Sequence, residues 1–179
     1  GTEFRIVDPD SLEPIPTGED GLILIGGPQI MKGYLKMPEK TAEVIELIDG
    51  FRWYRTGDKG HLDEDGFLTI VDRYSRFAKI GGEMISLTTV EEEILDALNT
   101  KDIEIAATCL PDQRKGEKIV ILATNNLDES HLKKLLLDAK INPLFHPAQV
   151  ILVDEIPKLG SGKTDFGETK KIALVNENK

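Results

Sequence analysis

The stretch that decides the fold runs from Gly66 to Ser86 and reads Gly-Phe-Leu-Thr-Ile-Val-Asp-Arg-Tyr-Ser-Arg-Phe-Ala-Lys-Ile-Gly-Gly-Glu-Met-Ile-Ser. It begins with an apolar run that ends at Val71, passes through a charged pentapeptide without Gly or Pro, and returns to alternating polarity after Gly81 and Gly82. Its composition fits a surface loop, since most connections in compact domains are short, and it also fits a linker between two modules. The sequence on both sides favours the linker.

Length and composition limit the class of protein. The chain has 179 residues, a net charge of −10 and an apolar fraction of 40%, which allows one large domain or two small ones. An acidic chain is a poor match for nucleic acid or for anionic lipid, because both bind basic surfaces. The longest apolar runs are too short to cross a bilayer. The single cysteine, Cys109, cannot form an internal disulfide, which fits a reducing compartment.

The first part of the chain predicts a small, mostly antiparallel β module. Short apolar or alternating runs, separated by turn-forming Asp, Pro and Gly residues, predict strands over 4–7, 22–25, 52–55, 60–62 and 67–71. The run over 22–25 is continuously apolar, which indicates burial on both faces. The spacing of Ala42, Ile45 and Ile48 predicts one short helix that ends at Asp49 and Gly50.

The second part of the chain predicts alternating helices and strands. Apolar residues at helical spacing predict helices over 87–98, 129–139 and 167–175. Thr88 or Thr89 is the predicted N-cap of the first helix. β-branched runs predict strands over 103–110, 118–124 and 149–153, the first two adjacent and antiparallel. The pattern is typical of a small α+β or α/β layer.

Two strings resemble ion or phosphate loops but fail on spacing. Residues 63–66 begin like a calcium loop, yet the next ligand position is Phe67, so a hairpin turn is the better interpretation. Residues 160–164 resemble a phosphate loop, but the motif needs Gly where Pro157 stands. Three histidines lie too far apart for metal-ligand spacing: His61, His131 and His146.

Two side chains stand out as candidates for chemistry. Gly57 is predicted to turn the backbone sharply at a strand end and to present the Asp58 carboxylate, which suits the vicinal hydroxyls of a ribose. The alternative for Asp58 is that it caps its own turn. Lys163 lies in a Gly-flanked loop, where an ammonium suits a transition state with negative charge on phosphate or carboxylate oxygens. The alternative is a solvated lysine in a turn.

Three motifs in fixed order resemble the C-terminal motifs of the adenylate-forming superfamily, which includes acyl-CoA synthetases, peptide-synthetase adenylation domains and luciferases. These motifs lie at 54–58, at 72–73 followed by 79–85, and at 157–163. The amino-acid sequence of 72–87 and 160–166 is most similar to the synthetase half of bacterial bifunctional 2-acylglycerophosphoethanolamine acyltransferase/acyl-[acyl carrier protein] synthetases. Two residues depart from the common pattern: many relatives have Gly in place of Asp72, and Asp or Lys in place of Ser75.

The resemblance implies an α+β fold with two domains. Residues 1–73 would form the β-rich, barrel-like last part of a large N-terminal domain. Residues 74–179 would form a small mobile C-terminal domain with a three-stranded sheet and helices. The chain would then be a fragment of a longer enzyme, and we expect it to be inactive alone, because most of the ATP and fatty-acid pocket would lie outside it.

The implied activity is a two-step ligase reaction. A fatty acid and ATP give acyl-adenylate, and a phosphopantetheine thiol of acyl carrier protein or coenzyme A then takes the acyl group. ATP or AMP and Mg²⁺ would be bound mainly by the missing N-terminal core. A lysophospholipid would be the partner of the missing acyltransferase part, and the full-length protein would lie at the cytoplasmic face of the bacterial inner membrane. Nucleic acid is not an expected partner.

The resemblance also implies roles for individual residues. Asp58 would bind the ribose hydroxyls, and Arg73 would bind the same ribose. Lys163 would bridge the carboxylate and the α-phosphate during adenylation, then leave when the C-terminal domain rotates about a hinge at Ser75. The residues that would face the pantetheine channel are Gly81, Gly82 and Glu83.

Three alternatives remain open from the sequence. One is an acyl-CoA synthetase fragment. Another is a non-catalytic module that docks an acidic carrier protein, which would need a local basic patch: either Arg114, Lys115 and Lys118, or Lys133, Lys134 and Lys140. The third is a P-loop nucleotide hydrolase, for which tight binding of ATP and magnesium by this chain would be the test.

Overall fold

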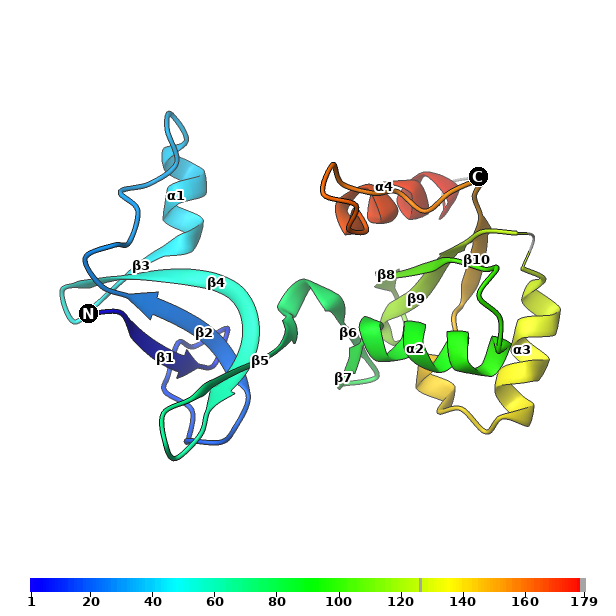
Figure 1. Cartoon of the computed structure of the whole chain (residues 1–179), viewed down its shortest axis with the longest axis horizontal. Coiled ribbons are helices and arrows are strands. Elements are labelled where there is room, and N and C mark those ends of the chain that lie inside the picture. Colours follow the sequence, from blue (N-terminus) through cyan, green and yellow to red (C-terminus); the bar gives the residue numbers. More distant parts are fainter. Residues whose placement is uncertain (126, 178–179) are drawn as a thin grey trace. The chain divides into compact units, whose positions relative to one another are not determined.

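The computed structural model describes residues 1–125 and 127–177 (Figure 1). The chain divides into two compact units, Gly1–Ser75 and Arg76–Lys179, called unit 1 and unit 2. Each unit has its own sheet and its own helices, and each is described separately. The predicted α+β class is confirmed.

Unit 1 is one antiparallel sheet with a single short helix. Its elements are β1 (Glu3–Val7), β2 (Gly21–Gly26), α1 (Pro38–Val44), β3 (Ile45–Ile48), β4 (Phe51–Leu62) and β5 (Leu68–Arg73). The strand order is β1-β2-β4-β3, and β5 pairs with β4. Because β4 is long, its first part pairs with β3 and its last part with β5, and the sheet curls into a half barrel (Figure 1). The core is formed by Val7, Leu22, Leu24 and Trp53.

The predicted helix around residues 42–48 is correct only in its first half. Helix α1 ends at Val44, and residues 45–48 form β3 instead. Asp49 and Gly50 both have positive φ and make a two-residue hairpin turn, so that Ile48 pairs with Phe51 on β4. An Asp-Gly pair between apolar runs is a strong hairpin signal, and it outweighs the helical spacing of the isoleucines.

Two predicted strands, 52–55 and 60–62, are one continuous strand. β4 runs from Phe51 to Leu62 and passes through Gly57 without ending. Pairing with β2 shifts register between Leu22 and Leu24, and pairing with β5 shifts between Lys59 and Gly60. These irregularities are bulges, which bend a strand while leaving it in the sheet.

Unit 2 is an α+β layer. Its elements are β6 (Phe77–Ile80), β7 (Glu83–Ser86), α2 (Leu87–Leu98), β8 (Ile105–Asp112), β9 (Gly116–Ala123), α3 (Glu129–Asp138), η2 (Pro143–Phe145), β10 (Gln149–Leu152) and α4 (Phe166–Glu177), preceded by a short 3₁₀ turn, η1 (Tyr74–Arg76). The sheet order is β10-β9-β6-β7, and β8 pairs with β9. The predicted antiparallel pairing of β8 and β9 is confirmed, while β10 runs parallel to β9.

The sheet of unit 2 has five strands, whereas three were predicted. The additional strands are β6 and β7, a hairpin on either side of Gly81 and Gly82. Each strand has only four residues, and the buried Ala78 and Ile80 alternate with the exposed Lys79. Such short runs next to charged residues carry little periodic signal, so the sequence indicated a linker here.

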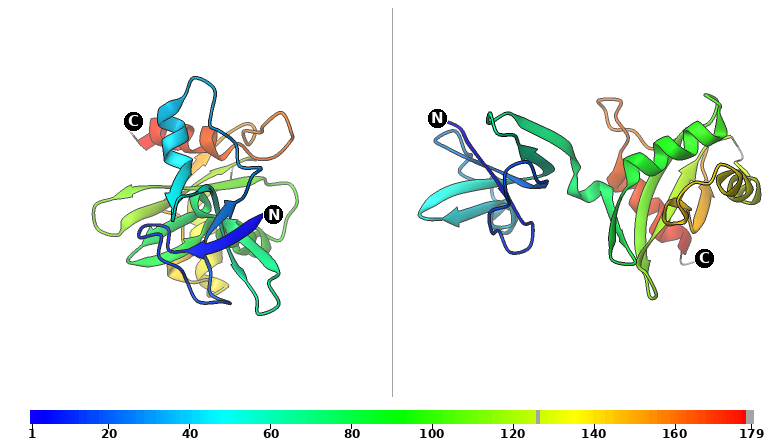
Figure 2. Two further views of the ribbon diagram at one scale, coloured as in Figure 1. Left: turned by 90° about the vertical axis from the view of Figure 1, so that its left-hand side faces the viewer. Right: turned by 90° about the horizontal axis from the view of Figure 1, so that it is seen from below.

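Helices cover both faces of this sheet (Figure 2). On one face α2 and α3 pack through Val90, Ile94, Leu132 and Leu136, and on the other face α4 packs through Ala173. The N-cap of α2 is Ser86, whose hydroxyl accepts a hydrogen bond from Thr89 N–H, and not Thr88 or Thr89 as predicted. In the part of the chain that the structure describes, no helix is long and apolar enough to cross a lipid bilayer.

Candidate functional site

Asp58 and Arg73 lie directly opposite each other on the neighbouring strands β4 and β5. Arg73 Nε is 3.5 Å from Asp58 Oδ1, and Arg73 Nη2 donates a hydrogen bond to the carbonyl of Thr56 (3.0 Å). The Arg73 side chain is 62% exposed and that of Asp58 is 28% exposed. The sheet therefore brings these two predicted residues together and leaves both charges accessible to a ligand.

Gly57 allows this close arrangement. Its φ is +77°, and a Cβ at this position would lie 3.2 Å from Arg73 Nη2. Any other residue would be strained in this backbone conformation and would press on the guanidinium. The sequence predicted correctly that Gly57 is conformationally special, but Asp58 lies within β4 and not at the end of a strand.

An open hollow of about 470 Å³ adjoins the pair, lined among others by Tyr34, Tyr54, Gly57 and Arg73. Its volume is in the range of about 300–1,000 Å³ that is usual for small-molecule sites. Burial raises the pKa of the Tyr54 hydroxyl, helped by a hydrogen bond with Tyr34 and by the negative charge of Asp58, while Arg73 lowers it. Two aromatic rings, a carboxylate and a guanidinium thus act on one another beside this hollow, and they can bind hydroxyls and a planar ring.

Ser75 lies in η1 and is the last residue of unit 1. It is exposed, and so are Val71 and Arg73 before it. Arg76 is different, because only 4% of this residue is exposed and its guanidinium contacts three elements of unit 2. The sequence marked this stretch as a linker, and the structure divides the two units within it.

Gly81 and Gly82 form the tight turn between β6 and β7, with φ of +60° and +90°. The turn and Glu83 after it are exposed. The tip of this hairpin is held by the neighbouring turn and strand: Gly81 N–H donates to the carbonyl of Lys115 in the β8–β9 turn (2.8 Å), and Lys79 N–H donates to Glu117 Oε2 on β9 (2.5 Å). The Gly81–Gly82 turn is therefore a fixed, exposed loop with no side chains at its tip.

Lys163 lies on a short loop between β10 and α4, and its side chain is exposed. The loop is closed by backbone hydrogen bonds from Leu159 N–H to Lys163 O (2.7 Å) and from Gly162 N–H to Leu159 O (2.8 Å). Lys158 and Thr164 form an isolated antiparallel bridge at its base. The loop presents one ammonium on a compact hairpin. The predicted residues thus fall into two sets: Asp58, Arg73 and Ser75 in unit 1, and Gly81, Gly82, Glu83 and Lys163 in unit 2.

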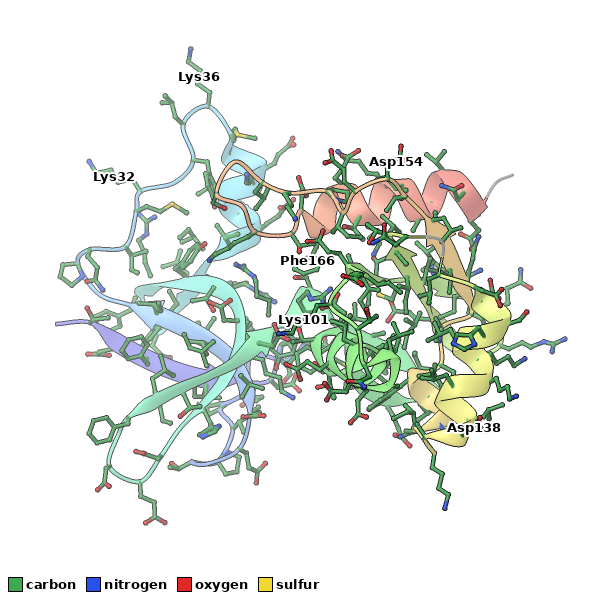
Figure 3. All side chains as sticks on the ribbon, turned by 45° about the vertical axis from the view of Figure 1, so that its right-hand side comes forward. Lys32, Lys36, Lys101, Asp138, Asp154 and Phe166 are labelled. Atoms are coloured by element: carbon green, nitrogen blue, oxygen red, sulfur yellow. The ribbon has the colours of Figure 1, made fainter. Side chains whose placement is uncertain are left out.

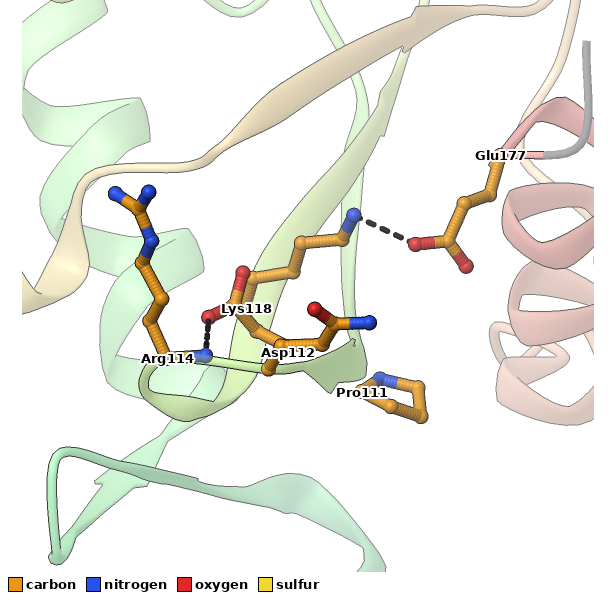
Figure 4. Close-up of a pocket in the computed structure, with 6 residues that line it drawn as sticks. Pro111, Asp112, Arg114, Lys118 and Glu177 are labelled. Atoms are coloured by element: carbon orange, nitrogen blue, oxygen red, sulfur yellow. Dashed lines mark hydrogen bonds and ion pairs between the residues drawn. The ribbon is translucent and has the colours of Figure 1, made fainter.

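The two predicted basic patches lie on unit 2. Arg114 and Lys115 lie in the turn between β8 and β9, and Lys118 lies on β9. Arg114 and Lys118 line a hollow of about 610 Å³ (Figure 4). Lys118 is ion-paired with Glu177 at 2.6 Å, and the Asp112 carboxylate accepts hydrogen bonds from the backbone N–H groups of Arg114 and Lys115. Acidic partners thus offset part of this patch. Lys133, Lys134 and Lys140 are exposed on α3 and just after it.

The remaining polar candidates have structural partners. His61 Nδ1 lies 2.7 Å from Asp20 Oδ1, and His146 Nε2 lies 3.1 Å from the carbonyl oxygen of Ile141. Among residues 1–125 and 127–177, no group of three His, Cys, Asp or Glu side chains is placed to hold a metal ion.

The motifs did not point to Tyr34 or Tyr54 beside the hollow, or to the burial of Arg76. Tyr54 belongs to the same motif as Asp58, so its place beside the hollow could have been inferred from strand geometry. Tyr34 comes from the segment before α1, and only the folded sheet brings it close. The burial of Arg76 has no sequence signal, because a charged residue in a charged pentapeptide is normally exposed.

No protein-family model matches the chain. Two curated relatives are the 2-succinylbenzoate–CoA ligase of Listeria monocytogenes, 36% identical over 159 residues, and a feruloyl-CoA synthase of an Amycolatopsis species, 34% identical over 173 residues. These matches cover 88% and 95% of the chain, but only 32% and 34% of the relatives. The chain therefore spans about a third of the length of the curated relatives it matches.

Among solved structures, the chain is similar to ATP-bound MatB from Rhodopseudomonas palustris, with a TM-score of 0.74 and 28% identity over 96% of this chain and 34% of that one. The likeness extends over both units. The relatives and structural neighbours of this chain are AMP-binding acyl- and aryl-CoA ligases of the adenylate-forming superfamily, and the chain has the fold of the C-terminal part of these enzymes.

Proposed function

We propose that this chain is the C-terminal part of an ATP-dependent ligase that activates a carboxylic acid as its adenylate and then transfers the acyl group to a thiol. The observation that carries the proposal is the Asp58–Arg73 pair, held opposite each other on β4 and β5 beside the tyrosine-lined hollow. This arrangement fits a nucleoside. The names of the relatives, which are CoA ligases, support the same reaction class.

In this proposal the pair binds the ribose. Asp58 Oδ1 lies near Arg73 Nε at 3.5 Å, a distance at the outer limit of hydrogen bonding, so the carboxylate keeps lone pairs for two ribose hydroxyls. Arg73 also has donors left after its one bond to the Thr56 carbonyl. ATP supplies the adenylyl group, and Mg²⁺ would be held mainly by protein outside this chain.

Lys163 is the proposed catalytic residue. Its ammonium on an exposed hairpin would neutralise negative charge on the carboxylate and the α-phosphate while the acyl–phosphate bond forms. In unit 2, the turn at Gly81 and Gly82, followed by Glu83, would let the narrow pantetheine arm pass close to the backbone. Movement about Ser75 would present these groups in turn, with the functional boundary at residues 73–74.

Two thiols are candidates for the acyl acceptor: that of an acyl carrier protein and that of coenzyme A. The amino-acid sequence of residues 72–87 favours an acyl carrier protein. The whole protein would then be a fatty acid–acyl carrier protein ligase that also carries a 2-acylglycerophosphoethanolamine acyltransferase. In that case, the acyltransferase, its lysophospholipid and the attachment to the inner membrane would lie outside this chain. The relatives, which are CoA ligases, favour coenzyme A. Initial rates of the whole ligase with coenzyme A and with holo-acyl carrier protein at equal concentration decide between them.

The central test is Lys163→Ala in the whole ligase. We expect the rate of adenylate formation, measured as pyrophosphate release, to fall by about 10²-fold or more. A loss of this size is typical for one electrostatic contact in a transition state. Thioester formation from supplied acyl-adenylate should be unchanged. Lys158→Ala is the matched control, because Lys158 lies on the same loop but is paired with Glu104 at 3.0 Å. Equal losses in both half-reactions would refute the role of Lys163.

A further inference from the structure

Arg76, the first residue of unit 2, is built into that unit by three contacts. Its Nη2 lies 2.8 Å from Glu91 Oε2 on α2, and its Nη1 donates a hydrogen bond to the carbonyl of Ala107 on β8 (2.8 Å). Its guanidinium carbon lies 3.7 Å from the centre of the Phe166 ring at the start of α4. The charge is therefore buried, paired and stacked.

These contacts close the free edge of the sheet. Within residues 1–125 and 127–177, β8 pairs with β9 alone, so its other side has no neighbouring strand. At Ala107 the N–H donates to Glu91 Oε1 (2.6 Å), and the C=O accepts from Arg76. The Arg76–Glu91 pair thus replaces a strand at this point, since buried backbone groups must find partners. It also spans the edge, because α2 and α4 pack on opposite faces.

Phe166 links this pair to the Lys163 loop. It is the first residue of α4 and the third after Lys163, and it lies where the loop meets the helix (Figure 3). Asp165 before it donates its N–H to Pro157 O (2.8 Å), and its Oδ1 accepts from Glu168 N–H (2.9 Å). The base of the loop is therefore fixed to the start of α4, and the Phe166 ring covers Arg76.

We propose that Arg76 is a positioning residue that ties the segment joining the two units to the base of the Lys163 loop. The proposal rests on the proposed role of Lys163. Because Ser75 is exposed and Arg76 is buried, a rotation at Ser75 would move Arg76, and with it Phe166 and the loop, as one body. Lys163 then keeps its place within unit 2 while the unit turns.

Arginine suits this role better than lysine. Its planar group offers a face to the Phe166 ring and edges to Glu91 and Ala107 at the same time. A lysine ammonium has no such plane and cannot stack on the ring while it bonds to both oxygens. Arg76→Lys therefore keeps the positive charge but removes the planar group that stacks on Phe166 while it contacts Glu91 and Ala107.

The first test is hydrogen exchange on this chain. Phe166→Leu removes the ring contact and leaves the Arg76–Glu91 pair intact, so that it preserves the fold. Phe145→Leu is the matched control, because Phe145 packs against the cluster on the opposite face. We expect Phe166→Leu and Arg76→Lys to speed exchange of the Gly162 and Asp165 amides by about tenfold, and Phe145→Leu to leave them unchanged. Unchanged exchange in both variants would overturn the proposal.

The second test separates positioning from simple stability. In the whole ligase, we expect Phe166→Leu and Arg76→Lys to lower adenylate formation by about tenfold, since small misplacements of a catalytic group are costly. Thioester formation from supplied acyl-adenylate should change less. In a Lys163→Ala background the same changes should have no further effect on adenylation. Additive losses there, or equal losses in both half-reactions, would overturn the proposal.

The two proposals fail in different ways. If Lys163→Ala alone lowers both half-reactions equally, the role of Lys163 is refuted. The link between Arg76 and the loop is then judged by the exchange of Gly162 and Asp165. If Lys163→Ala affects adenylation selectively but the Arg76 and Phe166 variants do not, only the positioning role is refuted.

Discussion

Two arginines three residues apart, Arg73 and Arg76, show how differently the two units use the same side chain. Arg73 in unit 1 is 62% exposed and lies 3.5 Å from its carboxylate partner, whereas the Arg76 side chain in unit 2 is 5% exposed and lies 2.8 Å from Glu91. The first pair is largely exposed and loosely joined, and the second is buried and close.

The difference follows from the elements around each pair. Arg73 and Asp58 project from two strands of a curled sheet, beside an open hollow. Arg76 lies at a sheet edge with helices on both faces, so it is desolvated and must find partners for its donors. An exposed pair contributes little to stability and can bind a ligand. A buried pair supports the fold, and breaking it is costly.

Glu91→Ala is the strongest way to test this contrast. It leaves the buried Arg76 charge without its carboxylate and the Ala107 N–H without its acceptor. We expect the free energy of unfolding of unit 2 to fall by about 3–5 kcal/mol, measured by hydrogen exchange of the slowest amides in β8 and β9. The fluorescence of Trp53, the only tryptophan, reports unit 1 and serves as the internal reference. A loss below about 1 kcal/mol would place this pair in the same class as the exposed one.

The pH dependence of stability through Cys109 tests whether water is excluded from the interior around β8, as the burial of Arg76 implies. Burial, the charge of Glu117 and a hydrogen bond to it raise the pKa of the Cys109 thiol from 9.0 to about 11. A raised pKa gives stability that is present below pH 9 and lost as the pH rises through 11. We expect unit 2 to lose at most about 2 kcal/mol over this range through this group. Cys109→Ala should lose less over the same range, and an identical pH profile would contradict a buried thiol.

Asp58→Ala should have the smallest effect on stability. Because its partner Arg73 is 62% exposed, we expect the free energy of unfolding of unit 1, measured by Trp53 fluorescence in urea, to change by less than about 1 kcal/mol. ATP binding by the whole ligase should weaken by about tenfold or more, because hydrogen bonds to a charged group are lost. Unchanged binding would remove Asp58 from the nucleotide site, and a large loss of stability would make it a structural residue.

The sequence predicted most of the helices and strands, but not every pairing between strands. The continuous apolar run at Leu22 predicted β2, and apolar residues at helical spacing predicted α2 and α3, because burial patterns are local. Ile45 and Ile48 fit a helix by spacing, but pairing across the Asp49–Gly50 turn made them a strand. The spacing of apolar residues within one segment does not show whether that segment pairs with another strand.

The candidate site was predicted in part for the same reason. Motif order pointed to Asp58, Arg73 and Lys163, and the sheet register brings the first two together. The part played by Arg76 depends on Glu91, Ala107 and Phe166, which come from three separate elements. Burial of a charged side chain is a property of the assembled fold, so no local pattern predicted it.

The side of β8 that has no neighbouring strand has a further consequence for variants of this protein. The strand carries a mostly apolar sequence, Ile105–Leu110, and a strand edge that loses its cover becomes a template for pairing with another chain. Glu91 and Arg76 occupy that edge at Ala107. Substitutions at either residue should therefore promote self-association at high protein concentration, through strand addition at β8, before the sheet itself unfolds.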